Sequence, residues 1–466
     1  MSREQAISRA ERYFDDGGFF ADLARRVAIP TESQNPERAA DLARYLTGEM
    51  RPSFERLGFR CRMFDNPVGK YGPFMIAERI EDPALVTVLS YGHGDVIRGQ
   101  DASWQAGLSP WTLKRDGDRL YGRGTADNKG QHSINLAAVA AALETRGRLG
   151  FNLKVLIETG EEVGSPGLKE FVSRNKALLQ ADVLIASDGP RLQPGRPTLF
   201  LGSRGAFNMD LVVDLREGGH HSGNWGGLLA NPGIILAQAL AAITGPRGEI
   251  KVEEWRPNTL TPAVREALAG LEVDGGADGP KVDPTWGEPG LTPAERVFGW
   301  CSFEVLAFTC GNPDKPVNAI PPRASCHCQL RYVVGVDPAD IVGALQRHLA
   351  RAGFPMVRVT AAREGFFPAT RLDPKHPWVV WVKESIEKTS RQPTAILPNL
   401  GGSLPNDVFS DLLGLPTVWI PHSYASCSQH APNEHMLAPV ARDALRLMAG
   451  LAWDLGEAGS LPGRKQ

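Results

Sequence analysis

The sequence predicts an α/β fold in which a mostly parallel central sheet is interrupted by a second, α+β domain. In the first third of the chain, and again near its end, short apolar runs alternate with helical stretches, the order typical of a parallel sheet covered by helices. Between these parts, alternating apolar and polar residues indicate half-exposed strands of another sheet. We therefore expect one domain built from residues 1–202 and 366–466, with residues 203–365 inserted into it.

The elements of the first part follow from apolar runs and helical spacing. Apolar residues between Ala39 and Leu57 recur at helical spacing, although Pro52 should bend that helix because proline lacks a backbone N–H. Three short apolar runs are expected to form buried strands. These strands cover residues 84–91, 152–158 and 181–187, and helices are expected over 129–145 and near 167–179 between them.

The inserted part begins near Gly202, where the apolar runs give way to alternation. The expected elements are strands over 207–213 and 324–334, a helix after Asn231-Pro232, a Gly/Pro-rich stretch over 274–290 and a helix over 338–351. After about residue 366 the α/β pattern returns. There we expect a helix over 378–389 and a buried strand over 415–420.

Composition argues against several classes of partner. The 51 Lys and Arg residues nearly balance the 53 Asp and Glu residues, so no basic face is expected for nucleic acid or for an anionic membrane. The longest uninterrupted apolar run, Leu136 to Leu143, is eight residues long, far short of the ~20 that span a bilayer. The first residues are charged and lack the apolar core of a secretory signal, so the expected location is the cytoplasm.

Cysteine usage argues against a disulfide framework and against a thiolate zinc site. The chain has six cysteines, and none forms a C-x-x-C pair. Cys326 and Cys328 lie two apart in a predicted strand and could share a face as ligands. The favoured interpretation is that they are small buried hydrophobic residues.

Five short segments contain nearly all the candidate ligands for a metal ion, and each follows a predicted strand or opens a loop. They are residues 91–95, 121–130, 159–164, 186–190 and 428–434. Because ligands of open α/β sheets bind outside the carboxyl ends of the strands, these groups can converge. Two histidines with several carboxylates form the nitrogen and oxygen ligand set of hydrolytic zinc sites. Gly122 and Gly124 lack the spacing of a nucleotide-binding loop, so a nucleotide site is discarded.

Two pairs of neighbouring residues suggest how such a site divides its tasks. His93 and Asp95, two apart in an extended segment, can point the same way, so that the carboxylate fixes the imidazole tautomer. The adjacent Glu161 and Glu162 must point in different directions. One of them can bind metal while the other reaches a water molecule, which separates a metal ligand from a general base.

Eight ordered motifs resemble those of the di-zinc metallopeptidases. In chain order they read H-G-D-V, L-Y-G-R-G-x-x-D-x-K-G, E-E-x-G-S-x-G, S-D, H-S-G-x-x-G-G, N-x-I-P-x-x-A, G-G-S-x-P and H-x-x-N-E, and the resemblance extends from about Val27 to His435. That family includes acetylornithine deacetylase, succinyl-diaminopimelate desuccinylase, carnosinase-type dipeptidases and glutamate carboxypeptidases. The resemblance implies a catalytic domain interrupted by a lid domain, residues 203–365, that also forms a homodimer.

The resemblance further implies two divalent metal ions per subunit, zinc first, with cobalt or manganese as alternatives. His93 and Asp188 would bind one ion, Glu162 and His430 would bind the other, and Asp127 would bridge the two. Glu161 would be the general base, and Asp95 would orient His93. Asn128 stands where many deacylase members carry a second Asp, whereas dipeptidase-like members often have Asn.

The remaining carried-over residues concern the substrate. His221 matches a lid histidine that reaches the partner subunit's site and stabilises the oxyanion, whereas its neighbour His220 is expected to be structural. Asn318 and Arg331, expected near each other in the lid domain, match positions that hold the substrate's carboxylate end. Gly401, Gly402 and Ser403 match a loop that contacts substrate. The approach to His430, Cys427-Ser-Gln, differs from the Gly-rich version associated with carnosinases, which leaves that wall of the site open.

The expected function is hydrolysis of an amide bond in a small substrate that carries a carboxylate. A dipeptidase or carboxypeptidase is the first choice, and an N-acyl-amino-acid deacylase of the acetylornithine deacetylase or desuccinylase type is the alternative, because both cleave an amide next to a carboxylate. Bound metal would polarise the scissile carbonyl, and Glu161 would move the proton from water to the leaving amine. A catalytically dead dimeric binding protein is the third possibility, disfavoured because every expected ligand is present.

Overall fold

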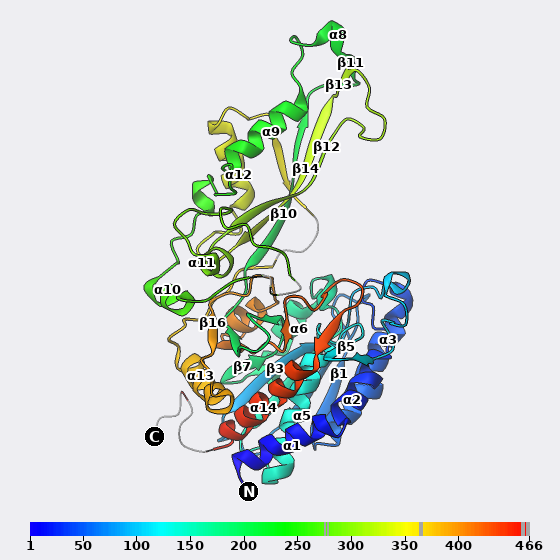
Figure 1. Ribbon diagram of the computed structural model, residues 1–466, viewed down its shortest axis with the longest axis vertical. Coiled ribbons are helices and arrows are strands. Elements are labelled where there is room, and N and C mark those ends of the chain that lie inside the picture. The colour runs from blue at the N-terminus through cyan, green and yellow to red at the C-terminus, as the bar shows by residue number, and fades with distance from the viewer. Residues whose placement is uncertain (275, 277–278, 363–366, 458–461, 463–466) are drawn as a thin grey trace.

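The computed structural model describes residues 1–274, 276, 279–362, 367–457 and 462. Figure 1 shows two parts: a lower lobe that holds both ends of the described chain, and an elongated upper lobe built around β10, β12 and β14. Each lobe has its own sheet, of eight strands in the lower and four in the upper. The expected α/β fold with a mostly parallel central sheet is confirmed.

The central sheet has the strand order β1-β2-β6-β3-β7-β17-β9-β16. β3 pairs in parallel with both β6 and β7, β7 pairs in parallel with β17, and β9 pairs in parallel with β16, whereas β1, β2 and the β17–β9 contact are antiparallel. The strands are β1 (Arg60–Phe64), β2 (Phe74–Arg79), β3 (Thr87–His93), β6 (Asn152–Glu158), β7 (Val183–Ala186), β9 (Thr198–Phe200), β16 (Ala395–Leu397) and β17 (Thr417–Trp419).

Helices cover both faces of this sheet. Successive strand residues point to opposite sides, so each face places apolar side chains in its own buried cluster. Val88 and Ile185 join one buried cluster, and the adjacent Leu89 and Leu184 join another. Against the first face pack α1 (Arg3–Asp15), α2 (Gly18–Val27), α5 (Lys129–Arg146), α13 (Pro377–Ser390) and α14 (Ala438–Leu455). Against the second face pack α6 (Leu168–Arg174), α7 (Lys176–Leu179) and η6 (Val408–Leu412).

The expected helix between Ala39 and Leu57 is broken into three pieces. They are α3 (Ala39–Arg44), a π-helical stretch η2 (Tyr45–Met50) and α4 (Arg51–Glu55), with η1 (Pro36–Arg38) before them. η2 runs directly into α4 through the helical residues Met50 and Arg51, so the N–H that Pro52 lacks falls inside a continuous helical stretch. The π-helical turn lies just before this proline, in agreement with the expected interruption.

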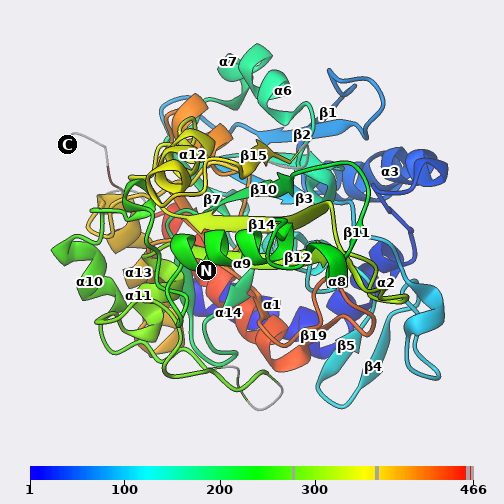
Figure 2. The same ribbon diagram turned by 90° about the horizontal axis from the view of Figure 1, so that it is seen from above.

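The upper sheet is antiparallel and has the order β12-β14-β10-β15. Its strands are β10 (Gly205–Asp214), β12 (Ser302–Cys310), β14 (Arg323–Tyr332) and β15 (Arg358–Ala361). α9 (Pro232–Ile243) and α12 (Ile341–Arg351) pack on one face around a third buried cluster (Figure 2). On β14, Cys326 and Cys328 point into that cluster and are at most 1% exposed, which confirms their interpretation as buried hydrophobic residues.

The segment between α9 and β12 joins both lobes. Its elements are η5 (Glu253–Trp255), α10 (Pro262–Leu268) and α11 (Pro293–Phe298). Trp255 belongs to the upper cluster, but Leu268 and Phe298 belong to the cluster on the second face of the central sheet. The division into residues 1–202, 203–365 and 366–466 stays a prediction, and its second boundary falls among residues 363–366, outside the described residues.

Short strands complete the loops around the two sheets. They are β4 (Lys114–Asp116), β5 (Arg119–Tyr121), β8 (Pro190–Arg191), β11 (His220–His221), β13 (Ala319–Ile320), β18 (Ser423–Tyr424) and β19 (His435–Leu437), with the helical turns η3 (Asp101–Ser103), η4 (Glu161–Val163) and α8 (Ser222–Trp225). Within the described ranges, none of the helices combines the length and apolar character needed to cross a membrane.

Candidate active site

The candidate ligands lie where the parallel strands of the central sheet end. His93 is the last residue of β3, Glu161 and Glu162 follow the end of β6, and Asp188 follows the end of β7. Asp127 comes from the loop before α5, and His430 comes from the loop before β19. Five segments of the chain therefore place acidic and imidazole groups at one edge of the sheet, as expected for ligand sites of open α/β sheets.

Asp127 lies between the two histidines. Its Oδ1 is 2.9 Å from His93 Nε2, and its Oδ2 is 3.0 Å from His430 Nε2. Asp188 Oδ2 lies 3.5 Å from His93 Nε2, and Glu162 Oε2 lies 2.9 Å from His430 Nε2. The result is two groups of three potential ligands that share Asp127, and in each group the ligand atoms all lie within 4.8 Å of one another.

This donor set fits a pair of divalent metal ions. Each group offers one imidazole nitrogen and carboxylate oxygens, which suits zinc-class ions. Asp127 directs one oxygen to each group, the arrangement that a bridging carboxylate requires. The residues that would hold the ions are those expected from the sequence: His93, Asp127, Glu162, Asp188 and His430.

The electrostatics of the group also call for cations. Burial, followed by the nearby Asp127, raises the pKa of Glu162 to about 7, and burial likewise raises the pKa of Glu161. Burial by itself lowers the pKa of His430, yet its hydrogen bonds to Asp127 and Glu162 raise that pKa to about 11. Without metal, the charge of the buried carboxylates is balanced by bound protons. Metal cations would take over this role and release the protons.

Asp95 organises the site in two ways, only one of which the sequence indicated. Its backbone carbonyl lies 3.1 Å from His93 Nδ1 and its Oδ1 lies 3.5 Å from the same nitrogen, so the carbonyl is the closer partner of the imidazole that the carboxylate was expected to orient. Its two carboxylate oxygens also accept the backbone N–H groups of Glu161 and Glu162, each at 3.1 Å. Asp95 is fully buried, so it fixes the turn that separates these two glutamates.

Behind Asp188, a buried hydrogen-bond network that the sequence did not reveal includes Asn128. Asn128 donates its side-chain amide to the Ser187 carbonyl at 2.8 Å, and its Oδ1 lies 3.1 Å from His132 Nδ1. The other ring nitrogen of His132 lies 2.6 Å from the Tyr45 hydroxyl. Asn128 therefore connects the segments of Asp127 and Asp188 and lies in neither group of three ligands.

Glu434 is a functional residue for which sequence reasoning gave no role, although it stands in the H-x-x-N-E motif. It is 1% exposed, and its carboxylate accepts backbone N–H groups from Gly124, Ala126 and Asp127 and pairs with Arg123 at 2.9 Å. One side chain thus ties the loop of His430 to the loop of Asp127. Gln429, also missed, donates to Asp127 Oδ2 at 2.5 Å.

The ligand groups open into a cleft of about 630 Å³ that also contains the predicted substrate residues Arg331, Gly402 and Ser403. Arg331 donates to Ser403 Oγ at 2.8 Å and to Gln329 at 2.9 Å. Its neighbour Arg204 is half-buried, and loss of solvent together with nearby Arg331 lowers the pKa of Arg204 to about 10. Of these two arginines only Arg331 lines the cleft, where its guanidinium group is a favourable partner for a carboxylate.

His327, Gln329 and Arg331 alternate along β14 with buried residues, as the sequence predicted. This alternation places the three polar side chains on the face of the upper sheet opposite its buried cluster. Asn208 on the neighbouring strand β10 accepts a hydrogen bond from Gln329 at 2.8 Å. Asn208 and Gln329 therefore extend the polar wall of the cleft beside Arg331.

His221 and Asn318 are not among the residues that line this cleft. β11, which contains His221, lies at the far tip of the upper lobe (Figure 1), and the Asn318 carbonyl accepts the N–H of Ser222 beside it at 2.9 Å. β14 separates this tip from Arg331, near the other end of the strand. The expectation that Asn318 lies near Arg331 is therefore wrong within one subunit, because the strand between them is ten residues long. His220 faces Trp225 in the tip.

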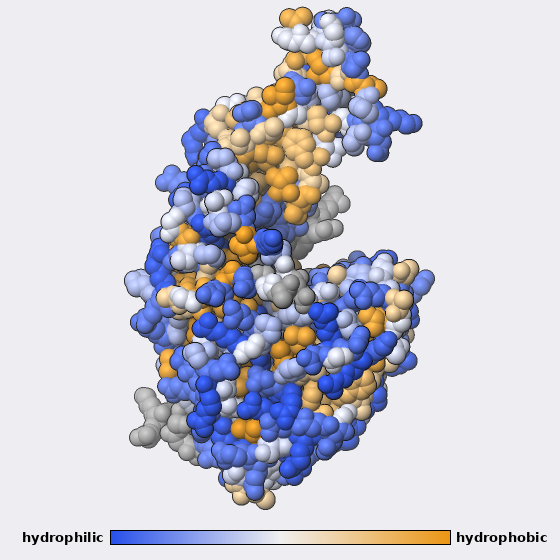
Figure 3. Space-filling model, viewed as in Figure 1, coloured by the Kyte–Doolittle hydropathy of each residue, from blue (hydrophilic) through white to orange (hydrophobic). Residues whose placement is uncertain are grey.

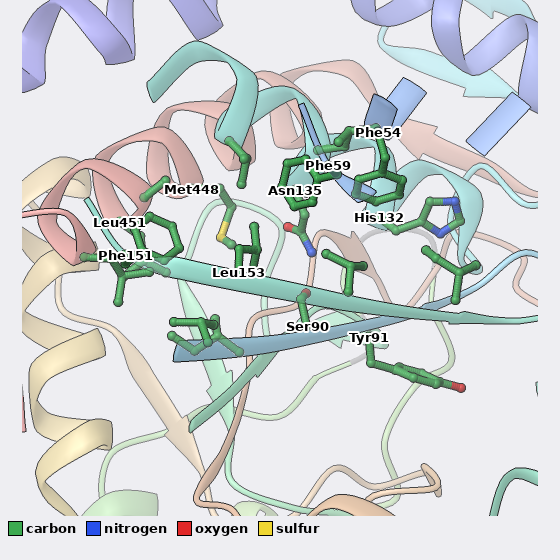
Figure 4. A pocket seen from close by; sticks show the side chains of 18 residues that line it. Phe54, Phe59, Ser90, Tyr91, His132, Asn135, Phe151, Leu153, Met448 and Leu451 are labelled. Carbon is green, nitrogen blue, oxygen red and sulfur yellow. The ribbon is translucent and has the colours of Figure 1, made fainter. Parts of the chain in front are cut away.

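A second cavity lies in the core of the lower lobe (Figure 4). It has a volume of about 60 Å³ and lies among residues of α5, α14, β3 and β6. Its lining is mostly apolar, with Asn135 and His132 among its few polar side chains. A space of this size holds at most a few water molecules, so we interpret it as a packing gap and not as a substrate site.

Comparison with known proteins places this geometry among peptidases. Residues 89–454 match the model of peptidase family M20/M25/M40. The chain is 28% identical to a cysteinylglycine-S-conjugate dipeptidase from Corynebacterium striatum over 68% of this chain and 70% of that protein. It is 32% identical to the human Beta-Ala-His dipeptidase, but over only 50% of this chain and 48% of that protein. Several of the curated relatives are thus matched over about half of their length or less.

Solved structures match over nearly the whole chain. An M20 family metallo-carboxypeptidase from Sulfolobus solfataricus has a TM-score of 0.77 at 26% identity and covers 94% of this chain and 99% of its own. The dipeptidase Dug1p from Saccharomyces cerevisiae has a TM-score of 0.78 at 21% identity and covers 98% and 100%. Human carnosine dipeptidase 1 has a TM-score of 0.75 at 23% identity and covers 97% and 98%. The last two likenesses concern the fold.

Proposed function

Because the chain belongs to peptidase family M20/M25/M40, we propose that it is a metal-dependent dipeptidase with two divalent ions per subunit, zinc first. Its substrate is a dipeptide with a free C-terminal carboxylate. The observation that carries this proposal is the shared cleft: two ligand groups joined by Asp127 open into the same space as Arg331 and Ser403. A cleft that contains both the metal ligands and the guanidinium group of Arg331 suits an amide bond near a carboxylate.

Bound at Asp127, the two ions would polarise the scissile carbonyl and lower the pKa of the attacking water. Glu161 is the general base in this proposal. It lines the cleft but belongs to neither group of three ligands, so its carboxylate is available to take the water proton and deliver it to the leaving amine. Asp95 keeps Glu161 in position by accepting its backbone N–H at 3.1 Å.

Arg331 holds the C-terminal carboxylate. Its Nη1 and Nε donate to Ser403 and Gln329, which fixes the plane of the guanidinium group at the cleft. A planar, fixed guanidinium can form two parallel hydrogen bonds with a carboxylate. Ser403 and the glycines before it form the facing loop, where a compact backbone leaves room for the substrate.

The functional unit is a homodimer in which the tip of one upper lobe completes the partner's site. His221 lies too far along the upper lobe to serve the cleft of its own chain (Figure 1). The edge strand β12 exposes Val305, Leu306 and Phe308 at 48%, 55% and 44%, next to a 65% exposed Ile234 on α9. This apolar surface, visible in Figure 3, supports association through β12 and α9.

A comparison of substrate classes tests the proposed function. Zinc-loaded protein is assayed with dipeptides and with N-acetyl and N-succinyl amino acids that carry the same C-terminal residue. Faster hydrolysis of dipeptides is expected. Faster hydrolysis of the N-acyl amino acids would instead identify a deacylase, which the same cleft can accommodate because both substrates place an amide next to a carboxylate. Failure to hydrolyse either class would contradict the proposal.

A further inference from the structure

One wall of the cleft is apolar and has no role in the chemistry described above. Its side chains come from the central sheet, the loop after β16 and helix α11: Phe200, Leu397, Leu400, Leu404, Val297 and Phe298. Other lining residues are polar and come from β10 and β14, including Asn208, Gln329 and Arg331. The cleft therefore combines an apolar group of side chains with polar ones.

The apolar wall is a built part of the lower lobe. Leu268 of α10 and Phe298 of α11 share a buried cluster with Phe200 and Leu400. An ion pair between Arg265 and Glu295 joins the two helices, and Arg371 donates to the Thr259 carbonyl just before α10 at 2.7 Å. These contacts fix α11 against the central sheet, so Val297 and Phe298 keep their place at the cleft.

The wall runs from the metal ligands to the carboxylate end. Beside Asp188, a Cβ added to Gly189 would meet Leu400 at 3.2 Å and Phe200 at 3.3 Å. At the other end, a Cβ added to Gly401 would meet Val297 at 3.2 Å, and Arg204 donates to the Gly401 carbonyl at 2.9 Å. Apolar side chains of the wall thus lie both beside Asp188 and beside the loop of Gly401 and Ser403, which contacts Arg331.

We propose that this wall binds the side chain of the substrate's C-terminal residue and selects aliphatic or aromatic side chains over glycine and charged ones. The proposal rests on the proposed function. When the amide nitrogen of that residue is at the metal ligands and its carboxylate is at Arg331, its own side chain is the group that lies between them. Burying an apolar side chain against Leu400 and Val297 is favourable, whereas a charged one would lose its hydration there.

A two-way dipeptide series tests this selection with zinc-loaded protein. The values of kcat/KM are measured for Ala-Leu, Ala-Phe, Ala-Gly, Ala-Glu and Ala-Lys, and for the reversed series Leu-Ala, Phe-Ala and Gly-Ala. Ala-Leu and Ala-Phe should exceed Ala-Gly by at least about tenfold, the usual effect of a few methylene groups in an apolar pocket. The spread within the reversed series should be smaller.

Two results would overturn the inference while leaving the proposed function intact: Ala-Gly hydrolysed as well as Ala-Leu, or a larger spread in the reversed series. Hydrolysis of no dipeptide in either series would contradict the proposed function instead. The two failures are therefore distinguishable in one experiment.

A substitution in α11 links the selection to the wall. Val297→Glu places a carboxylate on the partly buried side chain that faces the cleft, and Val297→Ala removes two methyl groups. Val297→Glu should lower the ratio of Ala-Leu to Ala-Lys hydrolysis by about tenfold or more. Val380→Glu, on an exposed position of α13 outside the cleft, is the matched control and should keep the wild-type ratio.

Folding of each variant is checked by circular dichroism and by zinc content. A folded, zinc-loaded Val297→Glu with the wild-type ratio would overturn the inference. If Val297→Glu fails to fold, the milder Val297→Ala decides the matter. It should reduce the preference for Ala-Leu over Ala-Gly by about threefold or more, and an unchanged preference would count against the wall.

Discussion

The carboxylate of Glu434 accepts the backbone N–H of Asp127 at 3.1 Å. The same carboxylate receives the N–H groups of Gly124 and Ala126, so it determines the path of the loop that presents the shared ligand. His430 lies four residues before Glu434, and its Nε2 is 3.0 Å from Oδ2 of Asp127. Two loops about 300 residues apart in the sequence are thus joined at Asp127, the residue that both ligand groups share.

Glu434→Gln should therefore weaken metal binding. The amide cannot accept all of these N–H groups, and its own NH₂ would point at donors. Loss of such a supporting group commonly costs 10- to 100-fold in metal affinity, roughly the effect expected here. Competition with a chromophoric chelator measures the affinity. Glu266→Gln, a 71% exposed carboxylate, is the control and should bind zinc like the wild type. Equal affinities in Glu434→Gln and wild type would refute this role.

The two adjacent glutamates should separate metal binding from proton transfer. Glu161→Gln should retain zinc and lose at least about 10²-fold in kcat, the usual scale for a general base. Glu162→Gln should instead lose zinc, because it removes the charge of a predicted ligand 2.9 Å from His430. Elemental analysis after desalting, together with steady-state kinetics, distinguishes the two. The roles would be reversed if Glu161→Gln lost the metal and Glu162→Gln kept it.

Arg331→Lys should impair substrates with a free C-terminal carboxylate. Lysine cannot form two parallel hydrogen bonds with a carboxylate and would leave Ser403 and Gln329 without their donor. The expected loss in kcat/KM is roughly 1.5–3 kcal/mol for a dipeptide and much less for the corresponding dipeptide amide. Equal losses on acid and amide would return Arg331 to a structural role.

Mixed dimers should recover activity that neither parent has. His221→Ala and Glu161→Gln homodimers are each expected to be nearly inactive. In a mixed dimer, one of the two sites contains both wild-type groups, because His221 of one chain serves the Glu161 of the other. Activity measured after subunit exchange, which is followed with differently tagged chains, should therefore rise. Exchange without recovered activity would mean that His221 does not act across subunits.

The convergence of His93, Glu162 and Asp188 was predictable because these side chains lie at or just after strand ends, and apolar runs locate strands well. His93, at the end of β3, is an example. The role of Glu434 was harder to predict because its partners are backbone N–H groups, and these do not depend on the residue type that the sequence shows. The hydrogen bond from Gln429 to Asp127 depends on how the loop of Gln429 turns, which the residue pattern does not indicate.

Long-range placement was also beyond the sequence pattern. Asn318 and Arg331 are both in the predicted lid, but strand β14 holds them apart, and periodicity does not say which end of a strand a loop adjoins. The stretch before β12 has little periodicity, so nothing in it predicted that α11 would pack on the central sheet and line the cleft.

The most direct test is a zinc titration of protein from which a chelator has removed bound metal, with hydrolysis of Ala-Leu followed at each step. No activity is expected without metal, and full activity is expected at about two zinc ions per chain, the stoichiometry of a binuclear site. The thermal midpoint should rise with bound zinc. Asp127→Asn should bind less zinc at every step, because both groups of ligands share this carboxylate. Full hydrolysis by the metal-free wild type would contradict the account.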